Sequence, residues 1–562
     1  MAFSIPPIAL PNPFVAVTQP IKIIVAEPTA NQLKSAVLYL VIGNKSISLQ
    51  QELDFVSVFG NIKTITFDIH DILQDYIGYQ VPPINQSGIV PAPKALQEFS
   101  LLVLGYDSNG YPLGLISQPS SGGKLYAVNA ALQYGQFHTY LNHYVLGMTP
   151  SNNIARFMTN APREKQVALY ESEFLSLMAK GGNASGWYVY VLRKRMNGDE
   201  KLYKFSISQA NNFVRFDIGT GPANINALAA GLINEQTQRY EVKIVAENGN
   251  LFPDGSNGTM DTSIIGLTTP KDPNPSPSST FRHSGAYSLK QRGSTPVFGF
   301  YPLLSHATPI VLQPNGSYLA TAFVYIQPLT GFSAPAGLSI LLLTETTPNG
   351  LSIRPVSKPD LSEGNLFGKW LQVSSIIETD NQQSNFPIKL VLMAITSGNG
   401  LLNSNVYIDD ISIVAFRPVS ESRTYVLDHQ CHEMPTRVHF LNRLGAFDSY
   451  TFTGLEKKTL KTKSNVYDKN LAGYFTKEAR GRDVQSVQAS EVFKCSTDAL
   501  RPEEIAWLEE LLTSPAIFIQ RNMEYIPVVI ANGSFETMNT DKNFQRLIVE
   551  FEMAKEVVLQ RN

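Results

Sequence analysis

The 562-residue chain has few cysteines and few charged residues. Its two cysteines, Cys431 and Cys495, can form one disulfide at most, so cross-links do not provide the framework of the fold. Charged residues make up 16% of the chain, below the roughly 25% of typical soluble domains. The formal net charge of -2 provides no overall field that would recruit nucleic acid or an acidic membrane surface.

A membrane span and a secretory signal are also missing from the sequence. No window approaches the roughly 18 consecutive apolar residues that a membrane helix needs. Residues 1–14 have no basic segment, and prolines interrupt their apolar residues, so they do not read as a signal peptide. We therefore expect a protein made in the cytoplasm, without membrane insertion, which leaves the cell by a route such as lysis if it acts outside.

The familiar catalytic motifs are absent too. The chain has no GxSxG elbow, P-loop, GxGxxG after a strand, or HExxH. Adjacent carboxylates such as Asp409 and Asp410 point to opposite faces of a strand, whereas a glycoside hydrolase needs two that converge across a cleft. We therefore expect no enzyme. A polysaccharide-degrading activity stays as the weakest alternative, because convergent carboxylates can lie far apart in a chain.

The composition that is present, with 38 Gly, 35 Pro and 24 Tyr, favours strands and turns. Apolar residues alternate with polar ones in short segments that end at turn signals such as Asn109-Gly110 and Asn197-Gly198. This pattern predicts an all-β, multidomain chain of β-sandwiches. The length suggests about three to five domains, and we divide the chain into residues 1–135, 136–245, 246–416 and 417–562.

The four segments differ in their patterns. The second repeats the order of strands in the first, down to a Phe-Asp-Ile triplet, so it is interpreted as a possible duplication. The third has short strands at even spacing, which is typical of a jelly roll. The fourth contains the one convincing helix, predicted over residues 502–513, with Pro502 in its first turn and an apolar stripe that includes Ile505 and Leu508.

Residues 246–416 resemble the jelly-roll carbohydrate-binding modules that accompany bacterial polysaccharide-degrading enzymes. The resemblance is carried by residues 250–255, 283–290, 368–374 and 406–413, in the order of that family. It implies a structural calcium at Asp410, although an exposed strand residue is an equally good interpretation. It also implies that sugars stack on exposed aromatic rings, and the candidates are Phe298, Tyr301, Tyr318 and Tyr325. The alternative for rings at alternating strand positions is burial in a core.

Residues 417–562 resemble the C-terminal parts of tail and baseplate proteins from phages of Bacteroidetes-type bacteria. Residues 438–448, 502–515, 525–530 and 547–554 carry this resemblance. It implies a tail-tube-like sandwich with one helix and a long hairpin, of the kind that forms hexameric rings. A distal-tail protein with an inserted carbohydrate-binding-type module would explain why the two resemblances share one chain.

Two clusters of polar residues remain. Residues 428–433, with His429 and Cys431 on one face of a strand, lack the paired spacing of a zinc site, so we predict no metal ligand there. The hairpin between residues 452 and 484 is rich in lysine, including Lys457, Lys458, Lys461 and Lys463. These lysines suit either a solvated loop or, in a ring, contact with a neighbouring subunit or a lumen through which DNA passes.

Together these observations predict a structural component of a phage tail tip or baseplate, or of a related contractile injection particle. It would form a hexameric ring or a multiple of one, contact other tail proteins, and present the jelly roll to host surface polysaccharide. The virion tail is then its location. The alternative from another class is a free glycan-binding surface protein of the bacterium.

Overall fold

The computed structural model confirms the all-β class. Helices α1 (His70–Gln74) and α2 (Pro502–Leu512) and the 3-10 helix η1 (His138–Tyr144) are the helices among the described residues, and none of them is long and apolar enough to cross a bilayer. The structure describes residues 13–27, 32–53, 55–56, 63–84, 89–118, 124–147, 154–169, 171–179, 186–207, 212–219, 236–251, 267–268, 276–280, 282–284, 288–292, 299–306, 309–330, 339–344, 348–357, 367–396, 404–430, 435–454, 457–469, 478, 481–521, 524–534, 545–554 and 557–561.

The chain forms two compact units, each built from separated stretches of sequence. Unit 1 contains residues 1–183, 208–234 and 427–562, and unit 2 contains residues 184–207 and 235–426. The four segments predicted from the sequence therefore do not correspond one to one with the units, because the chain enters unit 2 twice.

The N-terminal part of unit 1 is a β-sandwich. One sheet has the order β1-β10-β8-β3-β4, with β9 also on β8, and the other has the order β2-β6-β5. Alternate residues of β3, such as Leu38 and Leu40, are fully buried and join Phe67 of β6 in the core. The strands are β1 (Phe14–Ala16), β2 (Lys22–Glu27), β3 (Ser35–Ile42), β4 (Lys45–Glu52), β5 (Phe55–Val56), β6 (Lys63–Asp68), β8 (Leu96–Tyr106), β9 (Pro112–Gln118) and β10 (Leu125–Val128).

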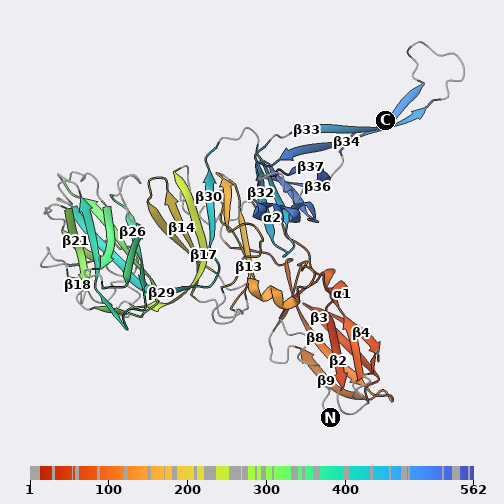
Figure 1. Cartoon of the computed structure of the whole chain (residues 1–562), viewed down its shortest axis with the longest axis horizontal. Coiled ribbons are helices and arrows are strands. Elements are labelled where there is room, and N and C mark those ends of the chain that lie inside the picture. The colour runs from red at the N-terminus through yellow and green to blue at the C-terminus, as the bar shows by residue number, and fades with distance from the viewer. Residues whose placement is uncertain are drawn as a thin grey trace. The chain divides into compact units, whose positions relative to one another are not determined.

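The C-terminal part of unit 1 has a long antiparallel sheet that carries helix α2 (Figure 1). Its order is β32-β31-β35-β36-β37-β34-β33, with β38 also on β34. Ile505 and Leu508 of the predicted apolar stripe pack into the core of this sheet, and Trp507 packs there beside them. The strands are β31 (Thr436–Leu441), β32 (Phe447–Phe452), β33 (Lys457–Asp468), β34 (Arg482–Ser496), β35 (Ile517–Arg521), β36 (Glu524–Ser534), β37 (Ile548–Met553) and β38 (Val557–Arg561).

A smaller sheet completes unit 1, in the order β11-β13-β16-β7. Its strands are β7 (Ile89–Pro91), β11 (Val145–Leu146), β13 (Phe174–Ala179) and β16 (Phe213–Asp217), and β12 (Glu164–Ala168) precedes β13 in the chain. Phe174 of β13 contacts His439 of β31, with 5.7 Å between the ring centroids. Residues from the second and fourth predicted segments are therefore in contact within one unit.

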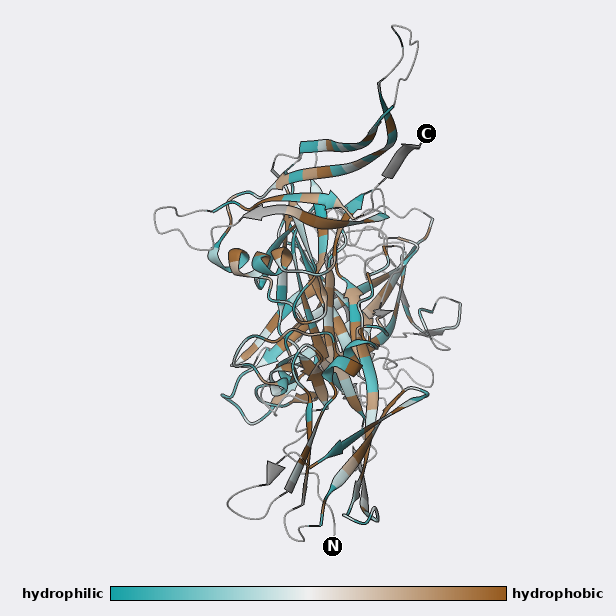
Figure 2. Cartoon of the chain, turned by 90° about the vertical axis from the view of Figure 1, so that its right-hand side faces the viewer, coloured by the Kyte–Doolittle hydropathy of each residue, from teal (hydrophilic) through white to brown (hydrophobic). Residues whose placement is uncertain are grey.

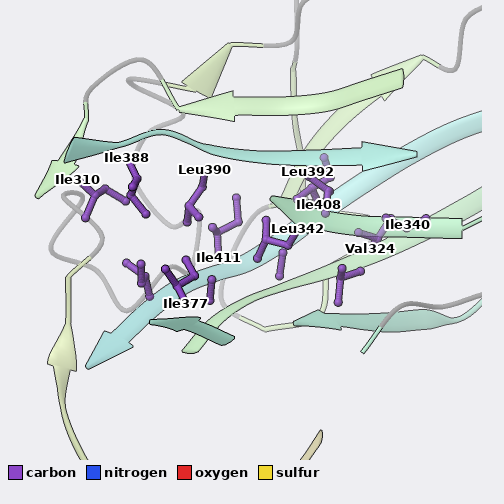
Figure 3. Packing of buried hydrophobic residues seen from close by; sticks show 14 of the residues in the cluster. Ile310, Val324, Ile340, Leu342, Ile377, Ile388, Leu390, Leu392, Ile408 and Ile411 are labelled. Atoms are coloured by element: carbon purple, nitrogen blue, oxygen red, sulfur yellow. The ribbon is translucent and has the colours of Figure 1, made fainter. Parts of the chain in front are cut away.

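Unit 2 is a two-layer sandwich around a large aliphatic core (Figure 3). Strands β26 (Trp370–Thr379), β23 (Ser317–Pro328) and β29 (Ser404–Pro418) supply one side of the core, including Val324, Ile377 and Ile408. The opposing sheet has the order β18-β21-β28-β24 and supplies Ile340 and Leu392. Its strands are β18 (Leu267–Thr268), β21 (Gly299–His306), β24 (Ser339–Thr344) and β28 (Leu390–Thr396), and β22 (Ile310–Leu312) pairs with β27 (Phe386–Ile388) nearby in the core.

A second, smaller core explains why the hairpin of residues 187–206 belongs to unit 2. Strand β17 pairs with both β14 and β29, so the strands β17-β14-β15-β25-β26-β23-β29 close into a ring. Each of these seven strands contributes one side chain to the same cluster: Tyr190, Leu202, Val245, Leu319, Val356, Ile376 and Phe416. Besides β23, β26 and β29, the ring contains β14 (Trp187–Arg195), β15 (Glu200–Ser206), β17 (Thr237–Asn250) and β25 (Leu351–Ser357). Strands β19 (Ser276–Ser278), β20 (Ser288–Arg292) and β30 (Arg423–Asp428) extend the same sheet.

Candidate assembly and binding surfaces

The hairpin predicted after residue 452 forms a long two-stranded ribbon of β33 and β34. The strands pair antiparallel from Lys457 opposite Lys494 to Asp468 opposite Arg482. All twelve residues of β33 are exposed, and among the described strands β33 pairs only with β34. Figure 1 shows the ribbon extending beyond β36 and β37, and Figure 2 shows apolar positions interspersed with polar ones along it. Both faces of β33 are therefore exposed, and no described strand pairs with its second backbone edge.

The four lysines predicted to mark this hairpin all lie on β33, and two of them pair with carboxylates of the same sheet. The Nζ of Lys458 lies 2.8 Å from Oε1 of Glu491, and the Nζ of Lys461 lies 3.9 Å from Oε2 of Glu552. Lys457 and Lys463 complete the set on the exposed strand. The ribbon therefore carries less unpaired positive charge than its sequence indicates. It also exposes the apolar residues Leu460 and Val466.

The aromatic candidates for sugar binding in unit 2 lie in different environments. Tyr318 is 2% exposed and lies in the main core, where its hydroxyl accepts a 2.7 Å hydrogen bond from the backbone N–H of Gln313. The prediction of a platform role for Tyr318 is thus corrected, because its ring fills the space beside Gly316. Phe298 lies outside the described residues, and Tyr301 is on β21, whose side chains are also outside them. Tyr325 is half-buried on the face opposite the core.

Tyr325 belongs to a row of aromatic side chains that crosses three strands. It lies directly opposite Trp370 on β26 and Tyr407 on β29. The ring centroids are 5.5 Å apart for Tyr325 and Trp370 and 6.0 Å apart for Tyr325 and Tyr407. Lys290 on β20 is opposite Tyr407 and places its ammonium 6.0 Å from the centre of that ring. Because neighbours along a strand alternate between faces, the row lies on the side away from Val324 and Ile326 of the core.

His283 lies next to this row and is held in place by Asp410. The imidazole of His283 stacks on Phe323, with centroids 3.7 Å apart, and meets Trp370 edge-on at 5.7 Å. Its Nδ1 lies 2.6 Å from Oδ2 of Asp410, whose other oxygen accepts a 2.5 Å hydrogen bond from Ser284 Oγ. The backbone of Asp410 has φ of +48°, a left-handed conformation that is costly for a residue other than glycine. The fold therefore fixes this carboxylate against His283 at the expense of local strain.

Asp409 holds the backbone of the segment that contains His283 and Ser284. Its buried carboxylate accepts hydrogen bonds from the backbone N–H groups of His283, at 2.9 Å, and of Ser284 and Asp410. Burial raises the pKa of Asp409, an effect that these N–H groups oppose. The predicted calcium at Asp410 gains no ligand set here: among the residues that the structure describes, no group of three or more His, Cys, Asp or Glu is arranged for a metal ion. Both oxygens of Asp410 instead hold protein groups.

A network of buried charges lies within unit 1. Lys165 of β12 and Arg437 of β31 bind opposite oxygens of Glu173, at 2.6 and 2.7 Å. Asp217 of β16 accepts the backbone N–H of Glu173 at 2.9 Å. Beside them, Nε2 of His439 lies 2.7 Å from Oε1 of Gln520. The ion pairs bring Lys165 and Arg437 together with Glu173, and such pairing is the condition for tolerating charge in a protein interior.

Burial shifts the pKa values of this network in characteristic directions. It raises the pKa of Asp217 to about 7, helped by the neighbouring charge of Glu173. It lowers the pKa of His439 well below 6.5, helped by the positive charge of Arg437. Burial also lowers the pKa of Lys165, while Glu173 opposes that change. The network therefore contains groups with opposite pH responses, and its position inside the packed core favours a structural role.

The predicted cluster at residues 428–433 is described only in part. Asp428 ends β30, and His429 and Gln430 follow it, whereas Cys431, His432 and Glu433 lie outside the described residues. Cys495 is buried in the core beneath α2. The absence of a metal ligand in this cluster stays a prediction.

Sequence reasoning missed His283, Trp370 and Tyr407 as site residues, although each lies in a stretch that resembles carbohydrate-binding modules. The alternation of apolar and polar residues in β23 was a usable signal, because it places Phe323 and Tyr325 on the face opposite Val324. The pairing of β23 with β26 and β29 was needed to complete the row. No known family model matches the chain, and a search of curated proteins finds no relative.

Proposed function

We propose that this chain is a structural component of a phage tail tip or baseplate, or of a related contractile injection particle. It assembles through the C-terminal sheet of unit 1 and presents unit 2 toward the host surface. The single observation that supports this proposal best is the ribbon of β33 and β34, in which every residue of β33 is exposed.

An isolated two-stranded ribbon is marginally stable in water, and a free strand edge readily pairs with another chain. β33 has such an edge and also exposes Leu460 at 56% and Val466 at 52%. A second copy of this chain is the occupant we propose. An edge strand that meets a different surface of the next copy makes a head-to-tail contact, which closes into a ring when the rotation allows. A hexamer or a multiple of it is the expected ring.

Unit 2 supports the second half of the proposal. Its two-layer sandwich places a row of aromatic and polar side chains on one outer face, a pattern suited to binding a ligand rather than to packing alone. The same row favours one alternative, a free glycan-binding protein of the bacterial surface. The weaker alternative is an enzyme that degrades capsule polysaccharide.

Negative-stain electron microscopy of the purified full-length chain tests the proposal against these alternatives. Closed rings are the expected result. Particles of monomer size at micromolar concentration, retained on immobilised glycans, would favour the free glycan-binding protein. Release of reducing sugar from capsule polysaccharide would favour the enzyme. Either of the last two outcomes, without rings, contradicts the proposal.

A further inference from the structure

The outer face of strands β26, β23 and β29 combines exposed rings with fixed polar groups. Trp370 and Tyr325 are half-buried, so each leaves part of its ring available, whereas Tyr407 beneath Lys290 is only 3% exposed and supports the row. Rings held side by side by cross-strand pairing lose little freedom when a ligand binds. The face is thus organised before any ligand arrives.

Two hydrogen-bonding groups flank the rings. On one side, the carboxylate of Asp410 faces Nδ1 of His283, so this nitrogen donates and Nε2 is the ring atom left to face a ligand. On the other side, Oε1 of Gln327 accepts from Tyr407 Oη at 3.0 Å and from Asn405 Nδ2 at 3.2 Å. Since this oxygen is already engaged, Gln327 offers a ligand its N–H donors. A ligand hydroxyl group can both donate and accept a hydrogen bond, so it could bond either His283 or Gln327.

The spacing of these groups favours a chain of sugars over a single one. His283 stacks on Phe323, and Gln327 is four residues farther along β23, which corresponds to about 13 Å. Among the described residues beside the row, one cation, Lys290, lies over Tyr407, and one carboxylate, Asp410, is engaged by His283 and Ser284. A nucleic acid strand would call for several cations along its path. A ligand with flat apolar faces, hydroxyl edges and no net charge fits these features.

We propose that this face binds a neutral oligosaccharide or polysaccharide, with sugar rings stacked on Trp370 and Tyr325 and hydroxyl groups bonded by His283 and Gln327. Asp410 is a positioning residue, because it acts by fixing the orientation and tautomer of His283. This inference rests on the proposed presentation of unit 2 at the host surface and names the ligand class and the side chains that would bind it.

The test is native affinity electrophoresis of the full-length chain in gels that contain soluble β-glucan, xylan or mannan. We expect at least one polymer to slow the protein. Trp370→Ala, Tyr325→Ala and His283→Ala should each weaken that binding about tenfold or more, whereas Tyr325→Phe, which keeps the ring, should stay within about threefold. The matched control is Tyr111→Ala, which removes an exposed aromatic ring from unit 1 and should change nothing.

A second readout covers the case in which an alanine variant fails to fold. Polymer binding should change the tryptophan fluorescence of the native chain, and Trp370→Phe should abolish that change while the gel shift remains. For Asp410→Asn we expect weaker binding with an altered pH profile, which a purely structural residue would not produce.

Failure of this inference is distinguishable from failure of the proposed function. The variants on this face should form the same particles as the native chain, so particle formation and sugar binding are scored separately. The inference is overturned if none of the three polymers slows the chain, or if the alanine variants bind as well as the native protein. It is also overturned if single-stranded DNA is the ligand that these variants lose.

Discussion

The ammonium group of Lys165 lies 2.6 Å from the carboxylate of Glu173, and both side chains are at most 7% exposed. The other oxygen of Glu173 binds Arg437, which is 264 residues away in the chain. Glu173 thus joins β12, β13 and β31. Two buried cations share its carboxylate, and Arg437 also pairs with Glu171 at 3.2 Å.

Replacement of Glu173 by Gln should destabilise unit 1 by about 3–5 kcal/mol, because Lys165 and Arg437 would lose their shared buried counter-charge. The measurement is denaturant unfolding in a background with Trp187→Phe and Trp370→Phe, so that Trp507, 4.8 Å from Lys165, reports on unit 1. The control is Glu509→Gln on the exposed face of α2, which should stay within about 0.5 kcal/mol. A loss as small as the control's would show that the network does not hold unit 1 together.

The stability of unit 1 should also depend on Asp217. Its folded-state pKa of about 7 is above the unfolded value of 3.8, so the folded state binds more protons between these two values. Its contribution is therefore present below about pH 4 and is lost as the pH rises through 7, by up to about 4 kcal/mol at roughly 1.4 kcal/mol per pKa unit.

The comparison of native chain and Asp217→Asn isolates this effect. His439 works in the opposite sense, because its lowered pKa costs stability as the pH falls below 6.5, and it cancels in the difference. The difference in unfolding free energy between the two chains should shift in favour of the variant from pH 4 to pH 7. A difference that is constant across this range would show that Asp217 titrates normally.

Tyr318 should matter for stability and not for sugar binding. Tyr318→Phe removes the hydroxyl that bonds the backbone of Gln313, which should cost about 1 kcal/mol. Tyr318→Ala also empties the space of a core ring and should cost about 3–5 kcal/mol. Thermal unfolding and affinity electrophoresis measure the two properties separately. Loss of sugar binding in a stable Tyr318→Phe variant would restore the platform role that its burial argues against.

The lysines of β33 should contribute to assembly through charge. A variant with Lys457, Lys458, Lys461 and Lys463 changed to Gln should form fewer oligomers than the native chain, and its assembly should depend less on salt. The matched control changes the same net charge at exposed lysines elsewhere: Lys22, Lys34, Lys94 and Lys369. Sedimentation velocity at several salt concentrations measures both. Equal assembly of the two variants and the native chain would assign the β33 lysines to solvation alone.

Local patterns in the sequence predicted the elements well. The stripe of Ile505 and Leu508, with Pro502 at its start, predicted helix 502–513, and the helix is Pro502–Leu512. The Asn109-Gly110 and Asn197-Gly198 turns join β8 to β9 and β14 to β15 as expected. These features depend on neighbours within a few residues, which a sequence displays directly.

The binding face and the units depend on pairings between distant residues. His283 and Asp410 are 127 residues apart, and only the order of β20, β29, β23 and β26 brings His283 to the aromatic row. The hairpin of residues 187–206 reads as part of a second sandwich, but its side chains Tyr190 and Leu202 complete a core with β29 and other strands of unit 2. The resemblance pointed to the segment that contains the aromatic row, while burial separated Tyr318, in the core, from Tyr325, on the opposite face.

Native mass spectrometry of the purified chain tests the central claim, self-assembly through the ribbon, most directly. We expect a closed oligomer of the 62.0 kDa chain, six copies or a multiple of six. In Leu460→Asp/Val466→Asp, charges replace apolar side chains at exposed positions, so a ribbon in solvent would tolerate them, whereas a covered ribbon would not. The double variant should therefore be a folded monomer, and Tyr111→Asp should assemble like the native chain. A native chain that stays monomeric, or a double variant that assembles fully, would contradict the account.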